Sequence, residues 1–173
     1  MDRDRLQRER VVLRRPEPTD AEEFLAAVDR SFTLHAQWVA PPSDLLAYAA
    51  YLRRIRQRNQ FGFLVRRIDD GELVGVVNVN NVVFGGFGSG SLGYYAFRGQ
   101  ERKGLMSEAV TGVLEHAFGN LRLHRMEANI QPANAPSIAL AKRCGFRLEG
   151  FSPAFLYIAG EWRDHERWAI TAG

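Results

Sequence analysis

Residues 92–108 constrain the fold and chemistry of this chain more than any other segment. Residues 92–97 have the pattern of a β-strand, residues 98–104 form a short basic turn, and a helical pattern begins at residue 105. A helix that starts in this way presents unpaired backbone N–H groups and the positive end of its dipole to whatever lies in front of it. Phosphate groups bind well there, and Arg98, Arg102 and Lys103 add positive charge. The segment therefore predicts a seat for a phosphorylated cofactor.

The length and charge of the chain indicate an ordinary globular protein. Its 173 residues predict a single domain spanning residues 1–173, and 46% of them are hydrophobic. The net charge of +3 does not predict a nucleic-acid-binding protein. Arginine is nevertheless clustered in two places, and a solvated surface is favoured there over an acidic or RNA-containing partner. The clusters are Arg3, Arg5, Arg8, Arg10, Arg14 and Arg15, and Arg53, Arg54, Arg56 and Arg58.

The compartment and the class of chemistry are narrowed by what the sequence lacks. Cys144 is the single cysteine, so the chain forms no internal disulfide and a reducing compartment is expected. The sequence shows no apolar run that resembles a signal peptide or could span a membrane, which predicts a cytoplasmic protein. No cluster of His, Cys, Asp or Glu has the spacing of metal ligands, so no metal site is expected.

Hydrophobic periodicity predicts a mixed α/β order with strand–helix–strand units in the second half. Turn signals separate the elements, and the glycine-rich residues 80–90 are expected to be a flexible loop. The expected strands are 11–13, 61–67, 72–79, 92–97, 124–130, 146–151, 154–158 and 162–170. The expected helices begin at residue 21, after residues 41–44, at residue 105 and near residue 136.

Four ordered motifs connect this chain to a known family. They are Glu-Arg-Lys-Gly-Leu-Met at 101–106, Asn-Ala-Pro-Ser at 134–137 with Arg-Cys-Gly-Phe at 143–146, Arg-Leu-Glu-Gly at 147–150, and Gly-Glu-Trp-Arg-Asp-His at 160–165. On these motifs the chain resembles the GNAT superfamily of acyl-CoA-dependent N-acetyltransferases. More narrowly, it resembles the RimJ/RimL branch, which acetylates the N-termini of ribosomal proteins. The resemblance implies the GNAT fold, a single central mixed and mostly antiparallel sheet flanked by helices.

The chain departs from the family pattern at three positions. The cofactor turn of the family is Gln/Arg-x-x-Gly-x-Gly/Ala; Gly104 fits it, but Glu101 and Met106 do not. Many members carry a tyrosine at the position of Ala141, where it protonates the leaving thiolate, and this chain lacks it. Ser137 resembles the alternative of the ribosomal-protein branch, in which a serine serves instead.

The resemblance implies direct transfer of an acetyl group from acetyl-CoA to an amine. It implies that a backbone N–H of residues 94–97 stabilises the thioester oxygen, with Glu149 as the base and Ser137 as the proton donor. The residues expected to bind the cofactor are Tyr95, Ala96, Phe97, Arg102, Lys103, Gly104, Leu105, Met106, Ser107 and Asn134. From the residues alone, Asn134 can instead be a helix N-cap, Ser137 a first-turn serine and Glu149 a solvent-facing residue.

The acceptor amine can be weighed by its pKa. An α-amine with a pKa near 7.7–8.0 is roughly 10–15% neutral at pH 7, whereas a lysine near 10.4 is below about 0.1% neutral. A site whose one evident base is a glutamate therefore suits a protein N-terminus better than a lysine. Two alternatives stay open: acetylation of a small amine such as an antibiotic, polyamine or amino acid, and a non-catalytic factor that binds CoA or ribosomes. The sequence also leaves open the acyl chain length and whether the protein is a homodimer.

Overall fold

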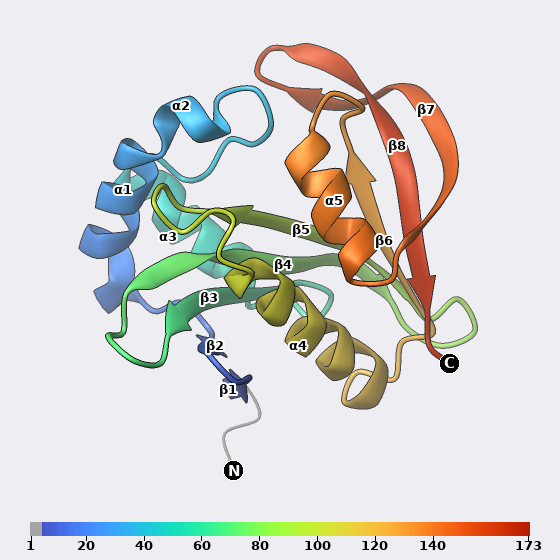
Figure 1. Cartoon of the computed structure of the whole chain (residues 1–173), viewed down its shortest axis with the longest axis horizontal. Helices are drawn as coiled ribbons and strands as arrows, with labels where there is room; N and C mark the ends of the chain where they lie inside the picture. Colours follow the sequence, from blue (N-terminus) through green and yellow to red (C-terminus); the bar gives the residue numbers. More distant parts are fainter. Residues whose placement is uncertain (1–4) are drawn as a thin grey trace.

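A computed structural model describes residues 5–173 as one eight-stranded sheet with helices on both faces (Figure 1). The strand order is β1-β2-β3-β4-β5-β6-β8-β7, and only the neighbours β5 and β6 run parallel. The strands are β1 (Arg5–Gln7), β2 (Val11–Arg14), β3 (Phe61–Arg67), β4 (Leu73–Val83), β5 (Ser89–Ala96), β6 (Arg125–Ile130), β7 (Arg147–Ile158) and β8 (Glu161–Thr171). The helices are η1 (Pro18–Asp20), α1 (Ala21–Arg30), α2 (Phe32–His35), α3 (Leu45–Arg54), α4 (Leu105–Gly119) and α5 (Ala135–Arg143). This arrangement confirms the mixed, mostly antiparallel sheet that the resemblance implied.

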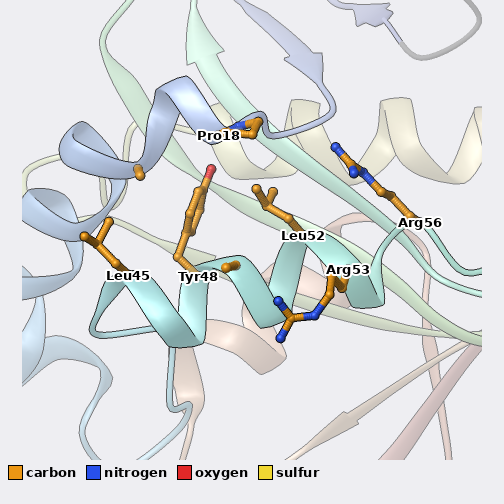
Figure 2. Close-up of a pocket in the computed structure, with 8 residues that line it drawn as sticks. Pro18, Leu45, Tyr48, Leu52, Arg53 and Arg56 are labelled. Carbon is orange, nitrogen blue, oxygen red and sulfur yellow. The ribbon is translucent and has the colours of Figure 1, made fainter.

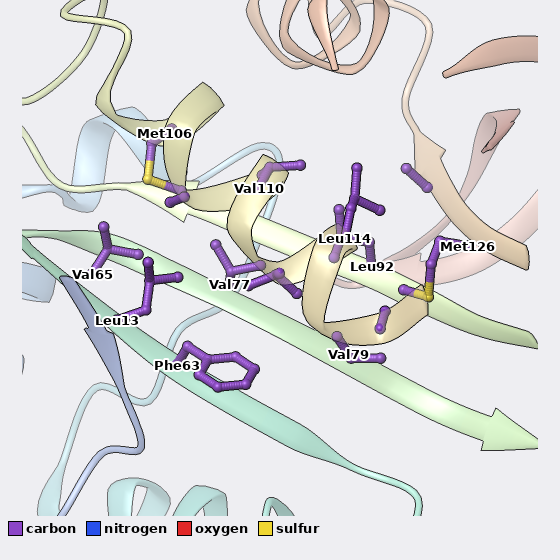
Figure 3. Packing of buried hydrophobic residues seen from close by; sticks show 14 of the residues in the cluster. Leu13, Phe63, Val65, Val77, Val79, Leu92, Met106, Val110, Leu114 and Met126 are labelled. Atoms are coloured by element: carbon purple, nitrogen blue, oxygen red, sulfur yellow. The ribbon is translucent and has the colours of Figure 1, made fainter. Parts of the chain in front are cut away.

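Strand alternation divides the buried side chains between the two faces. Val77 and Val79 of β4 pack in the cluster that contains Val110 and Leu114 of α4 (Figure 3). Val76, which precedes Val77, packs instead in a second cluster with residues of α1 and α3. Each such buried aliphatic side chain contributes about 1.5–3 kcal/mol to the free energy of unfolding. One face of the sheet therefore belongs to α4 and α5, and the other to α1–α3.

The observed elements differ from the expected ones in four places, of which three concern whole elements. Strand β1 and the short helix α2 were not expected, because three- and four-residue elements carry too little periodicity to be recognised. The two strands expected at 146–151 and 154–158 form the single strand β7, whose pairing with β8 is irregular between Ser152 and Leu156.

The loop expected at residues 80–90 is shorter in the structure, because only residues 84–88 connect the two strands. β4 extends to Val83 and β5 begins at Ser89. Gly90 is buried, and a Cβ there would lie 3.3 Å from Met126 and from Val79. Glycine at this position therefore allows close packing inside the sheet, which a composition-based interpretation mistakes for flexibility.

Most of the described arginines of the N-terminal cluster pair with carboxylates of the same chain. Arg8 binds Glu115 at 2.6 Å, and Arg14 binds the buried Asp20 at 2.5 Å. Arg10 binds Glu108 of α4 at 2.5 Å. These contacts tie the first strands to α4 and to η1, in agreement with the solvated-surface interpretation; Arg3 lies outside the described residues. Within residues 5–173, no helix is both long and apolar enough to cross a membrane.

Candidate functional site

The parallel strands β5 and β6 separate halfway along their length. Their Cα partners run from Ser89–Arg125 to Leu92–Ala128 and end there. β5 nevertheless continues to Ala96, and β6 continues to Ile130. We call these diverging ends, residues 93–96 and 129–130, the splay. The edge of β5 that faces the splay has no strand partner, so its backbone groups are available for a ligand, apart from Ala96 O, which lies 2.8 Å from His35 Nε2.

The register shows which groups of β5 face the splay. Phe97 N–H donates to Val74 O at 2.8 Å, which makes these two residues a hydrogen-bonded antiparallel pair. Such pairs alternate along the strands, so Tyr95 also directs its N–H and C=O toward β4. Tyr94 and Ala96 direct theirs into the splay. Of the residues expected to bind the cofactor here, Ala96 thus offers a backbone N–H, and Tyr95 and Phe97 belong to the β4 ladder.

The predicted phosphate seat lies directly after β5. α4 begins after Gly104, whose φ of 78° is in the left-handed region that favours glycine, and no side chain caps the helix. The amides of Leu105, Met106 and Ser107 therefore have no intrahelical acceptor, since the helical bonds begin with Glu108 N–H to Gly104 O at 3.3 Å. These three amides and the helix dipole form the anion site that the sequence predicts.

The charged side chains around this seat are used differently from what the sequence suggests. Arg98 donates to Arg30 O at 3.0 Å and to Thr33 Oγ1, so it ties the turn to α1 and α2 and is not a mobile phosphate ligand. Glu101 accepts from Gly99 N–H at 2.6 Å, which turns its carboxylate back onto the loop. Arg102 and Lys103 remain as exposed positive charges at the seat, and Lys103 Nζ donates a long hydrogen bond of 3.4 Å to Gln100 Oε1.

The first turn of α5 is anchored to the splay. Asn134 Oδ1 accepts from Ser137 N–H at 3.2 Å, so Asn134 is the N-cap of the helix. Tyr94 OH donates to Ser137 O at 2.9 Å, and burial raises the pKa of Tyr94 to about 12, which keeps the phenol protonated. The structure thus brings Ser137 and Asn134 to the same splay as Ala96, on the face covered by α4 and α5.

This geometry agrees with the comparison to known families. Residues 10–147 match the family model for the acetyltransferase (GNAT) domain. The chain belongs to the GNAT acetyltransferase family. It is therefore an acetyltransferase, and the splay and the uncapped helix end lie within the matched region.

Two relatives with named activities and one solved structure are similar to this chain. The chain is 39% identical over 116 residues to the [ribosomal protein uS5]-alanine N-acetyltransferase of Escherichia coli, which covers 67% of this chain and 60% of that enzyme. It is 32% identical over 131 residues to an L-methionine sulfoximine/L-methionine sulfone acetyltransferase of Pseudomonas aeruginosa, with 75% of each chain covered. Among solved structures, RimJ of Mycobacterium smegmatis in complex with CoA-disulfide has a TM-score of 0.86 and 29% identity, and covers 94% of this chain and 82% of that one.

Glu149 lies on the opposite face of the sheet from Ser137. Its carboxylate binds Arg125 at 2.6 Å and Arg147 at 2.9 Å, and these guanidinium groups hold its pKa below the usual range. β7 is two strands away from β6 in the sheet, a separation of about 10 Å. A carboxylate with a lowered pKa is a weaker proton acceptor. Its role as the base stays a prediction, which this environment does not favour.

Replacing Glu149 by glutamine tests that role. Because two ion pairs account for the carboxylate, we expect the variant to keep kcat within about threefold and to melt at a lower temperature, which thermal unfolding and steady-state kinetics measure. The stabilising effect of the wild-type carboxylate should be present above its ordinary pKa and disappear as the pH falls through the lowered one, since protonation breaks both pairs. A loss of about two orders of magnitude in kcat, at unchanged KM for acetyl-CoA, would instead establish Glu149 as the base.

Two polar residues at the splay were not recognised from the sequence. His35 Nε2 lies 2.8 Å from Ala96 O, and Asn129 follows Ala128 on β6 where the strands part. His35 belongs to no motif, and Asn129 is one polar residue in an alternating strand. A local pattern therefore carries no signal for either. In residues 5–173, no three His, Cys, Asp or Glu side chains gather as a metal ion would require.

Two cavities flank α3, apart from the residues of the splay. The first, of about 310 Å³, lies between η1 and α3 and is lined by Pro18, Tyr48, Leu52, Arg53 and others (Figure 2). The second, of about 390 Å³, lies between α3 and the preceding loop and is lined by Pro41, Pro42, Ser43, Tyr51 and Arg54, among others. Neither shares a residue with β5, β6 or the start of α4.

Proposed function

We propose that this acetyltransferase transfers the acetyl group of acetyl-CoA to the N-terminal α-amine of a protein, with an alanine-starting ribosomal protein as the first candidate. The observation that carries the proposal is the 39% identity to the enzyme that acts on the alanine of ribosomal protein uS5. The likeness in fold to RimJ, at a TM-score of 0.86, supports it.

The described residues fit acetyl-CoA at both of its ends. The uncapped amides of Leu105, Met106 and Ser107 would hold the pyrophosphate, with Arg102 and Lys103 beside them. The unpartnered edge of β5 would pair with the amide-containing arm, as a neighbouring strand does. Asn134 would contribute to the site by capping α5 and fixing the position of Ser137, because its side-chain oxygen already accepts a hydrogen bond from Ser137 N–H.

When bound, acetyl-CoA supplies a thioester whose carbonyl carbon a neutral amine can attack. The N–H groups of Tyr94 and Ala96 face the splay and would donate to the carbonyl oxygen as it gains negative charge. As the C–N bond forms and the C–S bond breaks, Ser137 would donate its hydroxyl proton to the departing sulfur, and the proton that the amine loses would restore the hydroxyl. Transfer is direct in this proposal, because burial raises the pKa of the Cys144 thiol, whose Sγ lies 3.8 Å from Ser107 O.

A small amine is the second candidate acceptor. The 32% identity to an enzyme that acetylates methionine sulfoximine and sulfone favours it, over three quarters of both chains. Both acceptors carry an α-amine, which is neutral far more often at pH 7 than a lysine side chain. The two candidates therefore differ in the part of the substrate beyond the amine, rather than in the reacting group.

Mass spectrometry of the protein incubated with acetyl-CoA tests the proposal. The acceptors would be alanine- and serine-starting peptides, a lysine-containing peptide with a blocked N-terminus, methionine sulfone and spermidine. We expect an acetyl increment on the peptide N-termini. An increment on methionine sulfone or spermidine alone would move the enzyme to the small-amine class and overturn the protein-N-terminal proposal.

A further inference from the structure

Two buried hydrogen-bond acceptors without partners lie on the two sides of the splay. His35 is 4% exposed, and its Nδ1 finds no hydrogen-bond partner in the described part of the chain. Asn129 Oδ1 is also buried and also finds no hydrogen-bond partner among the described residues. Leaving such an atom unsatisfied costs about 1–3 kcal/mol, so native proteins keep few of them. Two of them on segments that border the same splay point to a ligand that donates hydrogen bonds.

The hydrogen bond of His35 defines which of its nitrogens is the acceptor. Nε2 lies 2.8 Å from Ala96 O, and a carbonyl oxygen can only accept, so Nε2 carries the proton. Nδ1 of the neutral ring is then a bare lone pair. Burial lowers the pKa of His35, which favours the neutral ring at pH 7, although the hydrogen bond to Ala96 O and the charge of Glu101 oppose this shift. The ring of Tyr95 packs against the imidazole.

Asn129 lies on the same face of the sheet as His35. Ala128 packs in the α4-side core, so the next residue of β6 directs its side chain to the other face. That is the face on which Tyr95 and Phe97 contact the His35 ring. Gly93, opposite Asn129 at the start of the splay, has no side chain, and a Cβ there would approach only Asn80 Nδ2, at 3.5 Å. No side chain of β5 therefore stands between the Asn129 side chain and the His35 side of the splay.

A second contact shows that these two segments meet. Gln131 Nε2 donates to Gln37 O at 3.0 Å. Gln37 follows His35 by two residues, and Gln131 follows Asn129 by two residues. The segment after α2 and the segment after β6 therefore touch each other, two residues along the chain from each of the unpartnered acceptors.

We propose that His35 Nδ1 and Asn129 Oδ1 bind the acceptor amine and hold it against the splay on the face opposite to Ser137. A primary amine or ammonium group donates two or three hydrogen bonds, so it matches the two unpartnered acceptor atoms, His35 Nδ1 and Asn129 Oδ1. The inference rests on the proposed function in taking the splay as the acetyl site, and it makes a primary amine the recognised group whatever chain it belongs to.

Steady-state kinetics of three variants test the amine site. His35→Gln keeps an N–H that can reach Ala96 O but has no basic ring nitrogen, and Asn129→Leu removes the amide at nearly constant volume. We expect each to raise KM for the amine at least about 10-fold and to leave KM for acetyl-CoA within about twofold, because a hydrogen bond to a charged group is lost. Gln60→Leu is the matched control, since Gln60 Oε1 is also buried and unpartnered but precedes β3, away from the splay.

An experiment without turnover separates this inference from the proposed function. In the protein saturated with CoA, the ¹⁵N signal of His35 Nδ1 should shift when alanine amide is added and should not shift with N-acetylalanine amide. No shift with alanine amide, or an unchanged amine KM in both variants, would overturn the amine site and leave the proposed function standing. If only a small amine is turned over, the proposed function fails and the kinetic test runs on that amine.

Discussion

Replacing Ser107 by glutamate is expected to weaken acetyl-CoA binding by roughly 100-fold without destabilising the fold. Ser107 lies in the first turn of α4, where its backbone amide is one of three uncapped donors. A carboxylate there would stand about 5 Å from a bound pyrophosphate, and like charges at that distance repel by about 3 kcal/mol at an effective dielectric constant of 20. The same carboxylate interacts favourably with the helix dipole, so the melting temperature should stay equal or rise.

Ser107→Gln separates charge from size in this test. Glutamine has nearly the shape of glutamate and carries no charge, so we expect its Kd for acetyl-CoA, measured by calorimetry, to stay within about threefold of wild type. Arg143 Nη1 lies 3.4 Å from Ser107 Oγ and would offset part of the new charge. Salt screens the repulsion between the carboxylate and the pyrophosphate, so the loss of affinity should be smaller at high salt. Equal Kd values for the glutamate and glutamine variants would place the pyrophosphate elsewhere.

The anion seat could be predicted from sequence because its causes are local. Gly104 adopts a left-handed backbone conformation, which glycine does without strain, and the apolar repeat that follows it predicts where α4 begins. Asn134 and Pro136 mark the start of α5 in the same way, and Asn134 does cap that helix. Such features depend on residues within one helical turn of each other, so the local sequence pattern is enough to predict them.

The acceptor side of the site could not be predicted, because its contacts join distant parts of the chain. Which residues of β5 face the splay depends on the pairing of Phe97 with Val74, and where the splay begins depends on the register with β6. The contact of Gln37 with Gln131 joins residues 94 positions apart. Glu149 shows what a motif leaves out: the family motif predicts a base, and the fold places two arginines beside its carboxylate, which no local pattern indicates.

Replacing Ser137 by alanine is expected to lower kcat by about 100-fold, the lower part of the range for a lost proton donor. The hydroxyl is the one group that the proposed mechanism places near the departing sulfur, because the tyrosine found at the position of Ala141 in many relatives is absent. The fold should tolerate the change, since the bonds of this residue that anchor α5 use its backbone N–H and C=O. KM values for acetyl-CoA and for the amine should therefore change less than about threefold.

Two further variants distinguish proton donation from a structural role of Ser137. Ser137→Thr keeps a hydroxyl and should retain at least about a tenth of the wild-type kcat. Asn134→Ala removes the cap from the same turn and should lower the free energy of unfolding by about 1 kcal/mol, without the loss of kcat expected for Ser137→Ala. Wild-type kcat in Ser137→Ala would leave this serine with no part in the chemistry, and the sulfur would then take its proton from solvent.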